Sequence, residues 1–347
     1  MKIAICKGFT NISFSKNNKS AASADIEYFI NQLGNSIDID IVSGKTSNTV
    51  IPNELGFVEL KTVDFNQYNL IVLFNFNINF FGGAENESGI ELYKALSRSD
   101  TKIAYIQTDC RLPFQKLWPL IQGKPWAEKY KESDFYIDEN RITYITQGSD
   151  LEKVKTTLSK KNLYSFANMY HYPIAETILA KYEIPSRLVD ERIWDLGFGG
   201  ATRDAHKVKK VKKYFTNPKF KNYVFGGIKL DGVDIHPKVS YQEMISTMMS
   251  CKGTVIVGDK HYEDNYFTLR MYESILAGCL TYIDYDFDTK QKFYQGKYPE
   301  LYIKSTDEII HLNNIELAKD ANDFILTSYN FKNSQEKLVS LLKSIDK

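Results

Sequence analysis

The amino-acid sequence predicts an α/β protein built from two parallel sheets that face a central cleft. Apolar runs typical of buried strands alternate with stretches whose apolar residues recur every three or four positions, as in amphipathic helices. This alternation favours parallel sheets covered by helices on both faces. The pattern occurs twice, and a polar stretch at residues 163–186 separates the two series. We therefore expect two domains joined by a linker there.

The expected elements follow from runs rich in Ile, Val, Leu, Phe and Tyr. In the first series the strands are residues 2–5, 37–42, 70–74 and 102–106, and the helices are residues 24–33 and 89–96. In the second series the strands are residues 194–198, 223–227, 253–258 and 280–284. Gly199 and Gly200 are expected to turn the chain, with a helix beginning near Thr202. Ligands of open α/β sheets bind beyond the C-terminal ends of strands, so the loops there should carry the chemistry.

Composition narrows the class of protein. The 347 residues exceed one small domain, and no apolar run approaches the roughly 20 residues that span a bilayer. The four cysteines lie far apart without a CxxC pair, and the histidines lack metal-ligand spacing, so we expect a reducing compartment, no disulfides and no metal site. The net charge of +1 gives no overall attraction to nucleic acid, so any DNA binding requires a local basic face.

Two segments of the second series suit a nucleoside diphosphate. Gly200, Arg203 and Lys207 combine a glycine turn, a helix N-terminus and two cations, which suits a diphosphate, although solvated cations at an ordinary strand–helix junction fit equally. In residues 258–273, Arg270 and Glu273 are three apart on a helix. A cation for phosphate beside a carboxylate for ribose hydroxyls fits a nucleotide, and a surface ion pair is the alternative.

The first series offers an acceptor side. Asp109, beside Arg111 and just past a strand, is a candidate general base, although a lone loop aspartate is commonly a cap. Phe80 and Phe81 follow Asn79 at a strand end, where they could support a flipped base or fill the core. The lysine-rich residues 206–213 could meet phosphates or form a solvated helix face.

These segments, in this order, resemble the DNA β-glucosyltransferase family of T-even bacteriophages. The matching motifs span most of the chain, to about residue 290. They include residues 1–5, 78–83, 108–114, 118–119, 125–127, 147–148, 199–200, 225–226, 258–260, 264–265, 268–270, 273 and 287–290.

The resemblance implies a GT-B fold of two Rossmann-like domains. It assigns residues 1–170 to DNA and the catalytic base, residues 185–328 to the UDP-sugar, and residues 329–347 to a helix returning to the first domain. The implied reaction moves glucose from UDP-glucose, with inversion, to the hydroxymethyl group of 5-hydroxymethylcytosine in double-stranded DNA, with base flipping. The expected protein is a monomer without membrane contact, in the cytoplasm of an infected bacterial host. A divalent cation such as Mg or Mn is compatible but not required.

The resemblance also assigns residues. The catalytic base is Asp109. The donor-binding residues are Asp25, Gly200, Arg203, Lys207, Phe225, Gly226, Lys238, Val239, Asp259, Tyr262, Arg270 and Glu273. The DNA-binding residues are Asn79, Phe80, Phe81, Arg111 and Lys124.

Three positions depart from the family pattern. The family has Glu at Asp25, Arg at Lys207 and a hydroxyl residue at Ala201. A shorter carboxylate changes reach, and Lys cannot reproduce the fork of Arg on a phosphate. The same reaction with another UDP-sugar, such as UDP-arabinose, or another hydroxylated pyrimidine is therefore the alternative. Rivals of other classes are a GT-B enzyme with a lipid or cell-wall acceptor and a non-enzymatic DNA-binding module.

Overall fold

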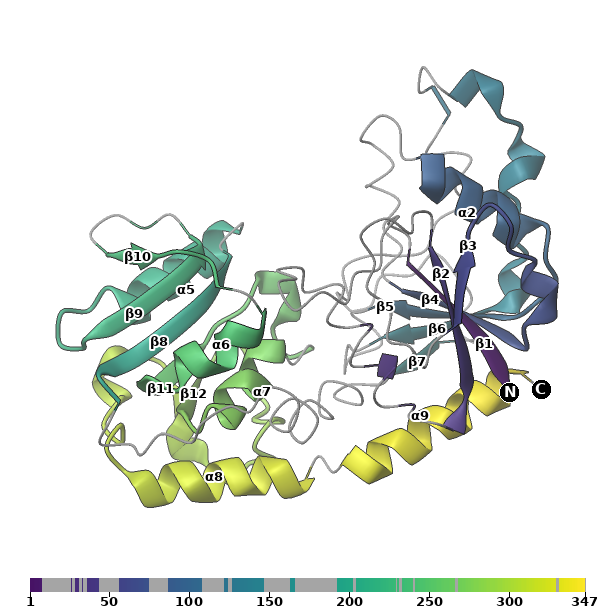
Figure 1. The fold of residues 1–347 in the computed structure, drawn as a ribbon. Helices are drawn as coiled ribbons and strands as arrows, with labels where there is room; N and C mark the ends of the chain where they lie inside the picture. The colour runs from purple at the N-terminus through teal and green to yellow at the C-terminus, as the bar shows by residue number, and fades with distance from the viewer. Residues whose placement is uncertain are drawn as a thin grey trace. The chain divides into compact units, whose positions relative to one another are not determined.

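The computed structural model divides into two compact units, comprising residues 1–18, 22–167 and 335–347, and residues 19–21 and 168–334. Figure 1 shows their elements. The residues that the structure describes are 1–7, 26, 29–30, 33, 36–43, 56–74, 87–107, 122–123, 127–146, 163–165, 192–201, 204–228, 230, 233–239, 241–265, 268–328 and 331–346.

The first unit contains a seven-stranded sheet in the order β3-β2-β1-β4-β5-β6-β7. All its neighbouring strands pair in parallel. The strands are β1 (Lys2–Lys7), β2 (Asp38–Ser43), β3 (Gly56–Glu59), β4 (Leu70–Phe74), β5 (Ile103–Gln107), β6 (Ile142–Thr146) and β7 (Leu163–Ser165). The strand order reverses between β1 and β4, as in a Rossmann-like fold.

The second unit repeats this plan in a six-stranded parallel sheet, in the order β10-β9-β8-β11-β12-β13. Its strands are β8 (Trp194–Ala201), β9 (Asn222–Gly227), β10 (Ile235–His236), β11 (Cys251–Ile256), β12 (Leu280–Asp284) and β13 (Tyr302–Ile303). Here the order reverses between β8 and β11. The two Rossmann-like sheets predicted from the alternating pattern are confirmed.

The described α-helices are α2 (Glu87–Ser97), α5 (Ala205–Phe215), α6 (Tyr241–Met248), α7 (Leu269–Leu276), α8 (Ile315–Ser328) and α9 (Phe331–Asp346). From residue 335 onward α9 belongs to the first unit, so the C-terminal helix returns there as the resemblance implies. Residues 26, 29 and 33 are helical and fully buried, in the three- and four-residue spacing that predicted a helix.

Alternating residues of β8 place helices on both faces of the second sheet. Phe198 packs against Phe215 of α5, with the ring centroids 5.1 Å apart. A Cβ added to the flanking Gly197 or Gly199 would lie 3.1 or 3.0 Å from the sulfur of Met248 or Met244, both in α6. Because successive strand residues point to opposite faces, α5 and α6 cover opposite sides of the sheet.

Three boundary predictions are wrong. Gly199 and Gly200 do not turn the chain but continue β8, where they pair with Phe225 and Gly226 of β9. Helix α5 begins at Ala205 rather than near Thr202, because the Asp204 carboxylate accepts the His206 N–H (2.9 Å) and caps it. The expected linker begins too early, since residues 163–165 form strand β7 and pair with β6.

Candidate functional site

The candidate site lies at the C-terminal edge of the second sheet. Its strands are parallel, so their C-terminal ends meet at one edge. Gly200 and Gly226 lie in the last two residues of β8 and β9, and Lys238 comes two residues after β10. Asp259 comes three residues after β11. The sheet topology therefore brings together four segments that the sequence named separately.

Two glycines let β8 and β9 approach each other closely at this edge. Gly226 has a φ of +116°, and a Cβ added there would lie 2.3 Å from the Gly200 carbonyl oxygen. A Cβ on Gly199 would lie 2.3 Å from the Phe225 ring, which is fully buried. A ligand contact by Phe225 therefore involves its backbone, and side-chain-free backbone at Gly200 and Gly226 suits the approach of an anion.

The N-terminus of α5 adds positive charge. Its first backbone N–H groups lack helical partners, and the helix dipole favours an anion there. Lys207 lies in the first turn, and its Nζ is 3.9 Å from Asp259 Oδ1 in the loop after β11. The sequence expected Arg203 to share this turn, but the helix begins after Arg203, which lies outside the described residues.

The loop after β11 is fixed by the loop after β12. Gly258 lies against Phe287, because an added Cβ would be 2.2 Å from that ring. Asp264, which has a φ of +57°, accepts hydrogen bonds from the Thr289 N–H (2.7 Å) and hydroxyl (2.6 Å). Lys292 Nζ donates to the Asp264 carbonyl at 2.8 Å. These contacts hold the short helix η9 (Lys260–Tyr262), which follows Asp259 and ends at Tyr262.

An ion pair between a half-buried arginine and a buried glutamate lies on helix α7. Arg270 Nη1 donates to Glu273 Oε2 at 2.5 Å, and Glu273 is 2% exposed. The alternative of a solvated surface pair is therefore wrong for Glu273. A buried carboxylate paired with a half-buried cation suits recognition of a hydroxyl and a phosphate on one ligand.

The strand β10 leads into Lys238 and Val239. The His236 ring stacks on Tyr223 of β9 with the centroids 4.0 Å apart, which fixes the end of β10. Lys238 is exposed and Val239 is half-buried. An aliphatic side chain next to a cation is suited to pack against a planar base.

The remaining predicted residues lie outside the described residues, so their roles stay predictions. The acceptor-side residues Asn79, Phe80 and Phe81 follow β4 in the chain, and Asp109 comes two residues after β5 ends. The others are Asp25, Arg111, Lys124 and Arg203.

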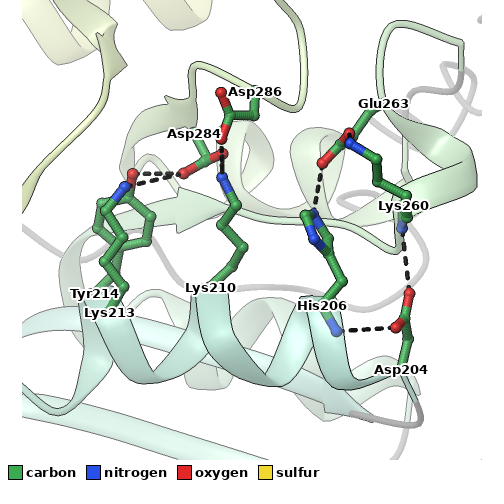
Figure 2. Close-up of polar contacts among 9 residues, drawn as sticks. All are labelled: Asp204, His206, Lys210, Lys213, Tyr214, Lys260, Glu263, Asp284 and Asp286. Atoms are coloured by element: carbon green, nitrogen blue, oxygen red, sulfur yellow. Dashed lines mark hydrogen bonds and ion pairs between the residues drawn. The ribbon is translucent and has the colours of Figure 1, made fainter.

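For residues 206–213 the sequence suggested phosphate contacts or a solvated helix face, and it predicted none of the contacts that several polar groups make around the site. Figure 2 shows these groups at the N-cap of α5 and along α5, in the loop after β11, at the last residue of β12 and just after β12: Asp204, His206, Lys210, Lys213, Tyr214, Lys260, Glu263, Asp284 and Asp286. Asp204 alone carried a usable signal, since Asp is a favoured helix N-cap. Lys260 and Glu263 are only three positions apart, but the contacts that tie α5 to the segments after β11 and β12 join residues more than 50 positions apart, which no local spacing reveals.

Two classes of site find no support in the described ranges. Within them, no three His, Cys, Asp or Glu side chains converge as metal ligands. No helix in those ranges is both long enough and apolar enough to cross a bilayer.

The family model described as bacteriophage T4 beta-glucosyltransferase matches residues 1–177, half of the chain. The chain belongs to the T4 β-glucosyltransferase family. As a member of this family it is a glycosyltransferase. The DNA beta-glucosyltransferase of Enterobacteria phage T4 is 27% identical over 331 residues, covering 89% of this chain and 88% of the relative.

Solved structures show the GT-B fold for this member of the T4 β-glucosyltransferase family. T4 phage BGT in complex with UDP and Mn²⁺ superposes with a TM-score of 0.80, at 23% identity and 99% coverage of both chains. An alpha-glucosyltransferase in complex with UDP and a 13-mer DNA containing an HMU base has a TM-score of 0.55, at 11% identity and 99% coverage of both chains. The GT-B prediction is confirmed.

Proposed function

We propose that this chain transfers glucose from UDP-glucose to the hydroxymethyl group of 5-hydroxymethylcytosine in double-stranded DNA, flipping the base and inverting the anomeric carbon. Relatives of the chain include T4 phage BGT in complex with its UDP-glucose substrate. The observation that carries the proposal is the edge of the second sheet, where a helix N-terminus, Lys207 and the pair of half-buried Arg270 with buried Glu273 follow neighbouring strands.

These groups divide between the parts of a nucleoside diphosphate. The α5 N-terminus and Lys207 suit the diphosphate, and Gly200 and Gly226 leave backbone open to it. Glu273 suits the ribose hydroxyls beside Arg270. Lys238 and Val239, after β10, suit the uracil. The donor assignment is thus consistent with the chemistry of each segment.

Asp109 is the proposed general base. Its carboxylate would take the proton of the acceptor hydroxymethyl group while that oxygen bonds to the anomeric carbon. The bond from that carbon to the diphosphate breaks on the opposite face, and UDP leaves with the electron pair. One displacement inverts the configuration and needs no covalent sugar–enzyme intermediate.

Cationic side chains would stabilise the departing UDP. Charge grows on the diphosphate as the bond breaks, and Arg203, Lys207 and Arg270 would offset it. A divalent cation such as Mg²⁺ or Mn²⁺ is compatible with the site and would add positive charge beside the diphosphate.

A buried base is out of reach of an enclosed sugar, so the acceptor is proposed to flip out of the duplex at a cost of about a few kcal/mol. Asn79, Phe80, Phe81, Arg111 and Lys124 are the proposed DNA contacts. We place the reaction in the cytoplasm of an infected bacterial cell, where phage DNA is present.

The test mixes the protein with hydroxymethylcytosine duplex DNA and a panel of UDP-sugars, and identifies the modified nucleosides by mass. A hexose gain with UDP-glucose is the expected result. A mass gain only with another sugar would support the alternative donor, a different UDP-sugar, and would point to Asp25, where the family has Glu, as the cause. No gain with any donor, despite tight UDP binding, would refute the proposed acceptor.

The base assignment has its own test. Asp109→Ala is expected to abolish transfer while leaving UDP affinity within about twofold, and Glu91→Ala, at an exposed position on α2, is the control. Transfer by a folded Asp109→Ala protein at the control rate would contradict the assignment.

A further inference from the structure

Two carboxylates each bind both His206 and Lys260, and together they close a ring between α5 and the loop after β11. The Asp204 carboxylate accepts the backbone N–H of His206 at 2.9 Å and that of Lys260 at 3.3 Å. The Glu263 carboxylate contacts the corresponding side chains, His206 Nε2 at 2.6 Å and Lys260 Nζ at 2.5 Å. Figure 2 shows this ring at the start of α5.

We propose that Asp204, His206, Lys260 and Glu263, called the clasp from here on, are positioning residues for UDP-glucose. The clasp fixes the donor-contacting side of the loop after β11 on the first turn of α5. This inference rests on the proposed function, because the clasp would position side chains that are themselves proposed to bind UDP-glucose.

Sequence adjacency connects the clasp to the donor. Each clasp residue is the direct neighbour of a proposed donor contact, so a shift of the clasp moves that contact as well. The neighbouring pairs are Arg203 and Asp204, His206 and Lys207, Asp259 and Lys260, and Tyr262 and Glu263. The Lys207–Asp259 ion pair, at 3.9 Å, joins the same two segments.

Burial differs between the two arms of the clasp. The side chains of Glu263 and His206 are 12% and 29% exposed, whereas that of Lys260 is 71% exposed. Solvent screens the Lys260 arm more strongly, so the His206–Glu263 arm should contribute most of the positioning. The backbone hydrogen bonds from His206 and Lys260 lower the pKa of Asp204, so its carboxylate stays ionised and accepts them across neutral pH.

Anchoring of α5 does not depend on the clasp. One turn further along the helix, Lys210 is hydrogen-bonded to the buried Asp284 at 2.6 Å. Tyr214 donates to the same carboxylate at 2.5 Å, which holds the helix on β12. Loss of the clasp should therefore release the loop after β11 and leave α5 in place.

The experiment measures UDP affinity by calorimetry and kcat and KM for UDP-glucose in Glu263→Ala and His206→Asn. We expect both to weaken UDP binding and raise KM about tenfold, equivalent to about 1.4 kcal/mol, with kcat changed less than about threefold, because ground-state contacts are misplaced. His206→Gln keeps an N–H donor near the position of Nε2 and should restore affinity to within about twofold of wild type.

A matched control is Lys252→Met, which removes another half-buried ion pair of the same unit. Lys252 Nζ lies 3.0 Å from Asp195 Oδ1, and both residues are near the starts of their strands, away from the site edge. This control should leave UDP affinity unchanged. Hydrogen exchange of the ligand-free proteins should rise in residues 257–265 for the clasp variants and not for the control.

The outcomes separate the clasp from the proposed function. A wild-type protein that binds no UDP would overturn the proposed function and, with it, the donor role of the clasp. If wild type binds UDP and folded Glu263→Ala binds it equally well, with unchanged exchange in residues 257–265, the clasp is refuted. Should Glu263→Ala fail to fold, His206→Asn decides by the same readouts.

Discussion

The ion pair between Lys210 and Asp284 predicts a large loss of stability when one partner is removed. Lys210 Nζ donates to Asp284 Oδ1 at 2.6 Å and also to Asp286. Asp284 is 2% exposed, and Lys210 is 9% exposed (Figure 2). Lys210→Met keeps most of the aliphatic volume and leaves the Asp284 carboxylate without its nearest cation.

The magnitude follows from what remains around Asp284. Removing one partner of a buried ion pair costs about 3–5 kcal/mol because the other charge stays buried. The Tyr214 hydroxyl still donates at 2.5 Å, and Lys213 Nζ lies 3.7 Å away, so the loss should fall at the lower end. We therefore expect about 3 kcal/mol, or a midpoint lower by roughly 6–12 °C for a unit of this size.

The assay is thermal unfolding of wild type, Lys210→Met and Lys210→Met/Asp284→Asn. The control is Lys209→Met, which removes an exposed lysine from the same helix. The double variant should recover part of the loss, because the stranded charge is gone. A loss below about 1 kcal/mol in Lys210→Met, or a double variant less stable than the single one, would refute the reasoning.

Three further outcomes are expected. Gly226→Ala should destabilise the protein by about 2 kcal/mol or more and weaken UDP binding, because it adds a clash to an unfavourable φ; thermal melts and calorimetry measure the two effects. Gly296→Ala is the control for the cost of φ alone, because Gly296 has a φ of +72° and no atom within 4 Å of an added Cβ. Arg192→Met should cost about 2 kcal/mol by denaturant melts, since the buried guanidinium donates to the carbonyl groups at positions 251 and 277, and a cost near zero would contradict this. The hydrogen bond from Lys210 lowers the pKa of Asp286 below its ordinary 3.8, so the stability from that contact is present above pH 3.8 and is lost as pH falls through the folded-state pKa. The difference in unfolding free energy between wild type and Lys210→Met should therefore narrow below pH 3.8. A difference that widens there would exclude this cause.

Most central strands were predictable from sequence, whereas the interior strand β6 (Ile142–Thr146) and the short edge strands were missed. Residues 70–74 are all buried, and their unbroken apolar run gave a clear signal. Strand β10 has only two residues and β7 only three, too few to show a period. β7 therefore looked like linker, and only its pairing with β6 shows otherwise.

The site was predictable where chemistry lies close in sequence. Arg270 and Glu273 are one helical turn apart, and their pairing was expected from that spacing. The pairing of His206 with Glu263, 57 positions away, had no such signal. With five histidines and 43 acidic side chains in the chain, residue type alone could not select this pair.

The error at Gly199 and Gly200 bears on the function of the site. Paired glycines were expected to bend the chain, but they extend β8 because the space above Gly199 is filled by the Phe225 ring. This extension pairs Gly200 with Gly226 at the edge of the sheet, and helix α5 begins only at Ala205, where Asp204 caps it. As the N-cap, Asp204 also accepts the Lys260 N–H at 3.3 Å. The glycines that extend β8 therefore also determine where α5 contacts the loop after β11.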